Sequence, residues 1–80
     1  MPILTIDARG YKPEDRDRVI TTMFDSLDSG ERMIIINDSD PSPILERIED
    51  DNDNIVEWEI YKNDPGHFEA AVSKRYQHYI

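Results

Sequence analysis

Residues 34–43 read Ile34-Ile35-Ile36-Asn37-Asp38-Ser39-Asp40-Pro41-Ser42-Pro43, a run of β-branched residues followed by a polar turn with two prolines. β-Branched residues favour strands, and proline suits the first turn of a helix. The segment therefore predicts a buried strand, a turn and a helix. A similar unit comes before it, where Ile3-Leu4-Thr5-Ile6 runs into Asp7-Ala8-Arg9-Gly10 and a further helix. Because neighbouring parallel strands end at the same edge of an open α/β sheet, we expect the two turns to lie side by side and to mark the site.

The first half of the chain predicts a strand, a helix and a second strand. Residues 3–7 form the first strand, and apolar residues then recur at helical spacing between Pro13 and Gly30, where the helix should end. Residues 31–37 form the second strand. Their continuous apolar centre indicates burial on both sides or a central place in the sheet.

The second half predicts a helix followed by a hairpin. Pro43 should start the helix with Ser42 as its N-cap, and the polar run 49–54 should end it. From Ile55 the apolar residues alternate with polar ones, which is typical of a strand with one solvent-exposed face. The turn chemistry of residues 63–66 then predicts a hairpin.

Apolar residues alternate again over residues 68–72, which predict the returning strand, and residues 76–80 should extend this strand or fray. The expected order is β-α-β-α-β-β in one domain, residues 1–80. Because parallel strands joined through a helix cross over right-handedly, both helices should cover one face of a four-stranded mixed sheet. The predicted class is therefore α+β, a two-layer α/β sandwich.

The composition narrows the class of protein. The chain has 18 acidic and nine basic residues and a net charge of −9, which disfavours binding to nucleic acid. It has no cysteine, so disulfides and thiolate chemistry are excluded. The longest apolar run, residues 33–36, is far too short to span a membrane, and no leader is apparent. We expect a cytoplasmic monomer. Two explanations of the acidic surplus stay open, a saline cytoplasm and an ordinary acidic protein.

Several short motifs resemble the family called domain of unknown function 2249, which is related to the TusA/SirA-like sulfur carriers. The matching residues are Asp7-Ala8-Arg9-Gly10, Pro13 with Asp15-Arg16, Ser29-Gly30-Glu31, residues 37–44, and Trp58-Glu59. The resemblance implies a strand order of 1-2-4-3 with strand 4 antiparallel to the others. It also implies an accessory or regulatory module, sometimes associated with redox metabolism or nitrogen-oxide respiration.

The chain departs from these relatives at positions that matter for chemistry. Sulfur carriers place a nucleophilic cysteine directly before a proline at the start of the first helix, and here that residue is Lys12. Persulfide relay at this position is therefore excluded. The nearer family often has histidine where this chain has Asp17 and Ser39, so a ligand or metal bound there by relatives need not bind here.

The turn residues allow a functional and a structural interpretation. Asp38 and Asp40 could bind Mg²⁺ or Ca²⁺, and Arg9 could hold an anionic ligand. Turn residues of these types more often hydrogen-bond their own backbone, and Arg9 more often pairs with a carboxylate. Asn37 should tie the two turns together. Tyr11 should be exposed enough to contact a partner.

Other candidate residues favour structural interpretations. The acidic run Glu49-Asp50-Asp51 with Asp53 is typical of a solvated helix end, and Trp58 should pack in the core. The histidines His67 and His78 lack the spacing of a metal site and are expected at the surface. Glu57 and Glu59 should discourage pairing at an edge strand.

We therefore predict a small non-catalytic accessory or regulatory module that binds another protein, with no catalytic residue, metal or cofactor. The alternative is a carrier or enzyme-like protein that acts on a small anionic or metal-bound ligand without a cysteine. The expected ligand- or partner-binding residues are Arg9, Tyr11, Lys12, Asn37, Asp38 and Asp40.

Overall fold

Four strands and two longer helices follow one another in the predicted order in the computed structural model, which describes residues 3–52 and 55–75. The elements are β1 (Leu4–Asp7), the 3-10 helix η1 (Ala8–Gly10), α1 (Pro13–Asp25), β2 (Arg32–Asn37), α2 (Ser42–Asp51), β3 (Val56–Asp64) and β4 (His67–Lys74). The strand order is β1-β2-β4-β3, with β1 parallel to β2 and β4 antiparallel to both of its neighbours. The predicted order 1-2-4-3 is confirmed.

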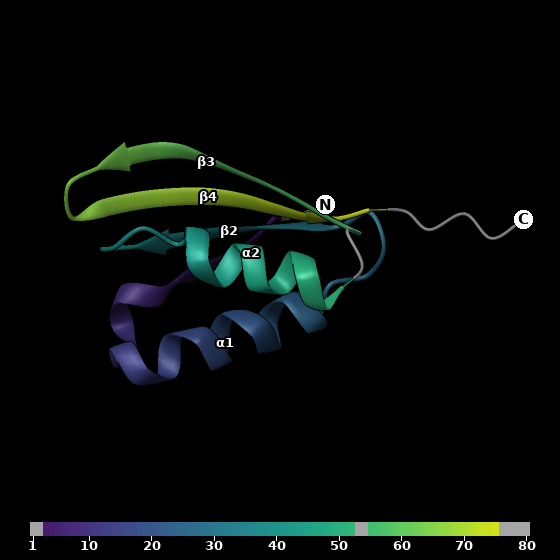
Figure 1. Ribbon diagram of the computed structural model, residues 1–80, viewed down its shortest axis with the longest axis horizontal. Coiled ribbons are helices and arrows are strands. Elements are labelled where there is room, and N and C mark those ends of the chain that lie inside the picture. The colour runs from purple at the N-terminus through teal and green to yellow at the C-terminus, as the bar shows by residue number, and fades with distance from the viewer. Residues whose placement is uncertain (1–2, 53–54, 76–80) are drawn as a thin grey trace, which may run out of the picture.

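Both helices lie on the same face of the sheet, and the opposite face carries no helix among the described elements (Figure 1). The predicted two-layer α+β sandwich is therefore confirmed. None of the helices in the described ranges combines the length and apolar character needed to cross a membrane.

The core lies between the helices and the sheet. Alternate residues of β2, Met33 and Ile35, point toward the helices and are fully buried, whereas Ile34 and Ile36 on the other face are half-buried. The apolar run over this strand thus reflects its central place in the sheet, not burial on both sides. Other core side chains come from both helices and three further strands: Ile6, Ile20, Phe24, Ile44, Leu45, Ile48, Val56, Ala70 and Val72.

The register places several chain segments at one edge of the sheet. Asp7 at the end of β1 lies opposite Ile36, and Asn37 at the end of β2 lies opposite Phe68 near the start of β4. The start of α1, the start of α2 and the β3–β4 hairpin lie at this same end (Figure 1). We call residues 7–12 and 37–42 the rim; each range starts at the last residue of its strand, β1 or β2, and includes the turn that follows. The expected side-by-side arrangement of the two turns is confirmed.

Two helix boundaries differ from the prediction. Helix α1 ends at Asp25, before Gly30, although Leu27 beyond it is still buried and continues the apolar pattern. Helix α2 starts at Ser42, so Ser42 is not its N-cap: Pro41 occupies that position. The Asp40 side chain supplies the capping contact instead, because its Oδ1 accepts a hydrogen bond of 2.9 Å from the Ser42 backbone N–H.

The hairpin turn is shorter than predicted. Strand β3 continues through Asp64, so the connection to β4 is only Pro65-Gly66. Gly66 has a φ of 78°, a left-handed conformation that glycine adopts without strain. Strand β3 also changes register between Ile60 and Lys62, which periodicity did not predict. The expected extension or fraying of residues 76–80 lies outside the described residues.

Leu45→Ala should destabilise the fold strongly, because the leucine side chain is fully buried between α2 and the sheet. We expect a loss of about 2–5 kcal/mol in the free energy of unfolding, a large part of the stability of so small a domain. Ile3→Ala is the control, since Ile3 is 50% exposed and its truncation should change stability by less than about 0.5 kcal/mol. Urea unfolding followed by circular dichroism measures both, and equal effects would contradict this description of the core.

Candidate functional site at the rim

Arg16 in α1 is the residue that joins the two turns of the rim. Its Nη1 donates hydrogen bonds to Asp38 Oδ1 at 2.7 Å and to Asn37 Oδ1 at 3.2 Å. Its Nε donates to the Tyr11 carbonyl oxygen at 3.1 Å. The side chain is only 15% exposed. One guanidinium therefore connects the chain that leaves η1 with the turn that follows β2.

Asn37 has the tying role that the sequence predicted, but it acts through Arg16. The residue is 6% exposed, and its side-chain nitrogen also donates a long hydrogen bond of 3.4 Å to Ser39 Oγ within its own turn. Arg16 is one of the residues that carry the family resemblance, but its contacts with the rim were not predicted from the sequence. The available signal was its position three residues after Pro13, which places it on the first turn of the helix beside the rim.

Arg9 pairs with a carboxylate, as the structural interpretation expected, and the partner is Asp7 of its own turn. Its Nε and Nη2 donate to Asp7 Oδ1 and Oδ2 at 2.9 and 2.7 Å. The Arg9 backbone N–H also donates to Asp7 Oδ1 at 3.1 Å. These hydrogen bonds lower the pKa of Asp7 to about 2 and, in turn, raise the pKa of Arg9. Arg9 is thus held against Asp7, not against Asp38 or Asp40.

A polar network extends from Arg9 across the face of the sheet that carries no helix. Arg9 Nη1 lies 3.4 Å from His67 Nδ1. On the other side of the ring, Nε2 donates to Glu69 Oε2 at 2.6 Å, because a carboxylate only accepts. Tyr61 donates its hydroxyl to Glu69 Oε1 at 2.9 Å. These hydrogen bonds from His67 and Tyr61 lower the pKa of Glu69.

His67 lies at the surface, as expected, with its side chain 32% exposed. The structure adds that the ring contacts Arg9 on one side and Glu69 on the other. No local pattern could predict this arrangement, because Arg9 and His67 are 58 positions apart. The second histidine, His78, lies outside the described residues.

The carboxylates of the second turn have structural partners. Asp38 pairs with Arg16. Asp40 accepts hydrogen bonds from the Ser42 backbone N–H and hydroxyl at 2.9 and 2.7 Å, which lower the pKa of Asp40. This matches the turn-building interpretation. Within residues 3–52 and 55–75, no group of three or more histidine, aspartate or glutamate side chains is arranged to hold a metal ion.

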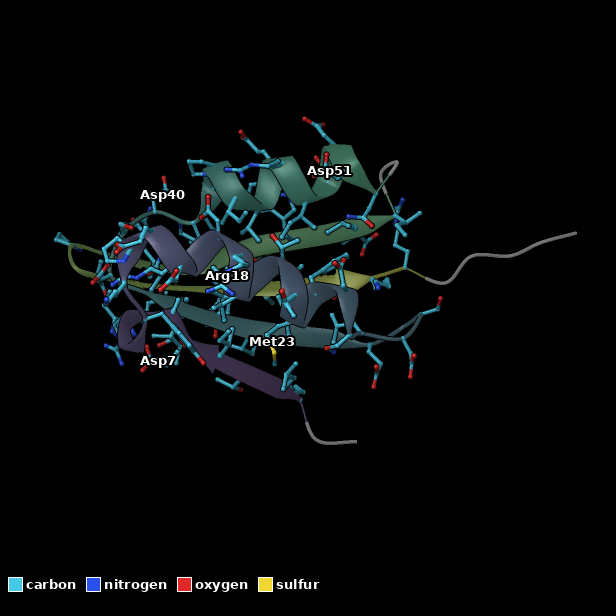
Figure 2. All side chains as sticks on the ribbon, turned by 90° about the horizontal axis from the view of Figure 1, so that it is seen from below. Asp7, Arg18, Met23, Asp40 and Asp51 are labelled. Carbon is cyan, nitrogen blue, oxygen red and sulfur yellow. The ribbon has the colours of Figure 1, made fainter. Side chains whose placement is uncertain are left out.

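A pocket opens beside these residues, between the first turns of α1 and the segment from β2 to α2. Its volume is about 150 Å³. The lining combines polar side chains with prolines and isoleucines: Pro13, Arg16, Asp17, Ile20, Asn37, Ser39, Asp40, Pro41, Pro43 and Ile44. Arg47 of α2 donates to Asp17 of α1 at 3.0 Å, which links the two helices at the pocket. Figure 2 shows Asp7 and Asp40 at the same end of the molecule and Asp51 at the other end of α2.

Comparison with protein families found a match over residues 5–74, which covers nearly the whole chain and every strand except the first residue of β1. The chain belongs to the family of uncharacterized conserved proteins, domain of unknown function 2249 (DUF2249). The family assignment drawn from the turn motifs is thereby confirmed. Comparisons with curated proteins and with solved structures found no match. In this DUF2249 chain the remaining predicted rim residues, Tyr11 and Lys12, are exposed and lie between η1 and α1.

Asp7→Asn should make the free energy of unfolding less sensitive to acid pH. Because the pKa of Asp7 in the folded chain, about 2, lies below its ordinary value of 3.8, ionised Asp7 stabilises the fold above that ordinary value. This contribution is lost as the pH falls through the folded pKa. The gap in unfolding free energy between the wild type and the variant should therefore close from about pH 5 to about pH 2. Asp25→Asn is the control, because Asp25 is exposed and forms no ion pair among the described residues; a gap that stays constant with pH would contradict the role of Asp7.

Arg16→Gln should destabilise the chain by about 1–3 kcal/mol, because it removes the partner of the buried Asn37 amide and of the Tyr11 carbonyl. Arg18→Gln is the matched control, since Arg18 is 75% exposed and its one ion pair among the described residues is with Asp15 at 3.3 Å. A double-mutant cycle with Asp38→Asn should give a coupling of up to about 1 kcal/mol between Arg16 and Asp38 in urea unfolding. The assignment of Arg16 fails if Arg18→Gln is equally destabilising.

Proposed function

We propose that the chain is a non-catalytic accessory module that binds another protein, and that the rim and its pocket form the binding surface. The observation that supports this best is that Arg9 and Arg16 are both paired with carboxylates of the chain, while a partly apolar pocket stays open beside them. Arg9 is paired with Asp7, and Arg16 with Asp38. Such pairing fixes the shape of the surface before a partner arrives, which lowers the entropy lost on binding.

The size of the pocket also favours a partner side chain. Small-molecule sites commonly enclose about 300–1,000 Å³. The rim pocket, at about 150 Å³, is smaller than this range. A single side chain from a docking protein would fill it, with the exposed Tyr11 and Lys12 available for contacts around it.

The rival function is binding or processing of a small anionic ligand, and the rim offers few free donors for it. The guanidinium groups of Arg9 and Arg16 already donate to carboxylates. The start of α2 is capped by Asp40, and Pro43 has no backbone N–H to offer an anion. A carrier function of the sulfur-relay kind would need a thiol where the chain has Lys12. A link to redox metabolism or nitrogen-oxide respiration stays a prediction from the family resemblance.

Site-specific photo-crosslinking tests the proposal. A benzoylphenylalanine in place of Tyr11, which is 44% exposed at the rim, should form a discrete adduct with one protein in cells of the source organism. The matched control carries the same group in place of Tyr61, which is 50% exposed on the face without helices. Adducts are identified by mass spectrometry. An adduct formed only from position 61 would move the binding surface to the open face of the sheet, and no adduct from either position would contradict a protein-binding function.

A further inference from the structure

We propose that the rim pocket receives one basic side chain, an arginine or a lysine, from the partner protein, with Asp40 as its ionic contact. This inference rests on the proposed function and adds the chemistry of the partner. It follows from the balance of charge around the pocket, from the apolar part of the lining, and from the way Asp40 is oriented.

Among the described residues, one carboxylate that lines the pocket has no cation as its partner. Asp17 is paired with Arg47 at 3.0 Å, and Asp38 is paired with Arg16 at 2.7 Å. Asp40 accepts hydrogen bonds only from Ser42, a neutral residue, among the described parts of the chain. One positive charge from a partner would give Asp40 an ionic partner, as Asp17 and Asp38 already have. The net charge of −9 would also attract a basic partner over longer distances.

Asp40 is held in a defined orientation. Its Oδ1 accepts both hydrogen bonds from Ser42, whereas no hydrogen bond reaches its Oδ2 from the described residues. Because the Ser42 hydrogen bonds already hold Oδ1, the Asp40 side chain loses little conformational freedom when it binds a cation. A preorganised acceptor of this kind suits a charge-assisted hydrogen bond from an ammonium or guanidinium group.

The rest of the lining suits the methylene groups of a long basic side chain. Pro43 at the start of α2 supplies the exposed apolar surface of the lining, whereas Ile20, Pro41 and Ile44 are buried and add little accessible area. Lysine and arginine place their apolar stems against such surfaces while their charged ends reach polar groups. An acidic side chain would meet the same apolar lining and would be repelled by Asp40.

Nuclear magnetic resonance titration with short peptides tests this inference on the intact chain. The probe is acetyl-Gly-Arg-Gly-amide at low ionic strength, where charge recognition is least screened. We expect it to shift the backbone amide signals of residues 14–20 and 39–44, prolines excepted. The comparison peptides carry citrulline, which keeps the shape of arginine without its charge, or glutamate. Both should bind more weakly than the arginine peptide.

Asp40→Asn is the decisive variant, because asparagine keeps an oxygen that can cap α2 and removes only the charge. We expect it to weaken binding of the arginine peptide roughly threefold to fivefold. Asp51→Asn is the matched control: it removes one charge from the opposite end of the same helix and should leave the affinity unchanged (Figure 2).

Three results would overturn the inference. Equal effects of Asp40→Asn and Asp51→Asn would mean a general attraction to an acidic protein. Equal binding of the citrulline or glutamate peptide at the pocket would keep the pocket as a docking site but reject its preference for a basic side chain; this comparison uses the wild-type chain and does not depend on how a variant folds. An arginine peptide that shifts no pocket signal rejects the basic anchor, while crosslinking from position 11 decides separately whether a protein binds at the rim.

Discussion

The rim depends on the buried end of β2. Asn37 continues the helix-facing positions of Met33 and Ile35, so its amide is carried into the region that α1 covers. A buried amide is stable there only if its polar atoms have partners. Arg16 supplies one, and the cost of partly burying a guanidinium is offset because Asp38 lies within 2.7 Å of it. Arg16 therefore stabilises the buried Asn37 amide, and Asp38 in turn stabilises the partly buried Arg16.

This dependence explains the shape of the pocket. Arg16 also holds the Tyr11 carbonyl, so the start of α1 cannot move away from the turn after β2 without breaking several hydrogen bonds together. The Asp17–Arg47 pair adds an exposed contact between the two helices a short way further along. The pocket lies between these two sets of contacts. Its walls are thus set by interactions that exist whether or not a partner is present.

The face of the sheet without helices is protected in a different way. Its central residues Ile34 and Ile36 are only half-buried, which would favour association if the surface around them were also apolar. The network that connects Asp7, Arg9, His67, Glu69 and Tyr61 crosses this face at the rim end. At the β3 edge, Glu57 is paired with Arg75 at 2.7 Å. Strand β3 is an edge strand, as predicted, and charged groups at a sheet edge oppose pairing with another strand. That Glu57 serves this purpose stays a prediction.

The sequence predicted the elements better than the contacts between them. The change from helical to alternating periodicity at Ile55 is a local property, so the strands and helices could be identified from it; the strand order came from the family resemblance. Helix ends were less accurate, because Leu27 continues the apolar pattern after α1 has stopped. Asn37 was found because the turn motif contains it. Arg16 and the Arg9–His67 contact were missed, since their roles arise only when distant segments pack together.

Lys12 shows why the function cannot be taken from the fold. The N-terminus of a helix stabilises negative charge, which is why a thiol at such a position becomes reactive. Here a cation precedes α1, and its side chain makes no capping hydrogen bond. Glu14 and Asp15 in the first turn supply the negative charge that this end of the helix favours. The positive end of the helix dipole therefore faces carboxylates of its own first turn, and the fold offers no thiol there to activate. Recognition at the neighbouring pocket through Asp40 rests on the local charges instead, and it stays a proposal.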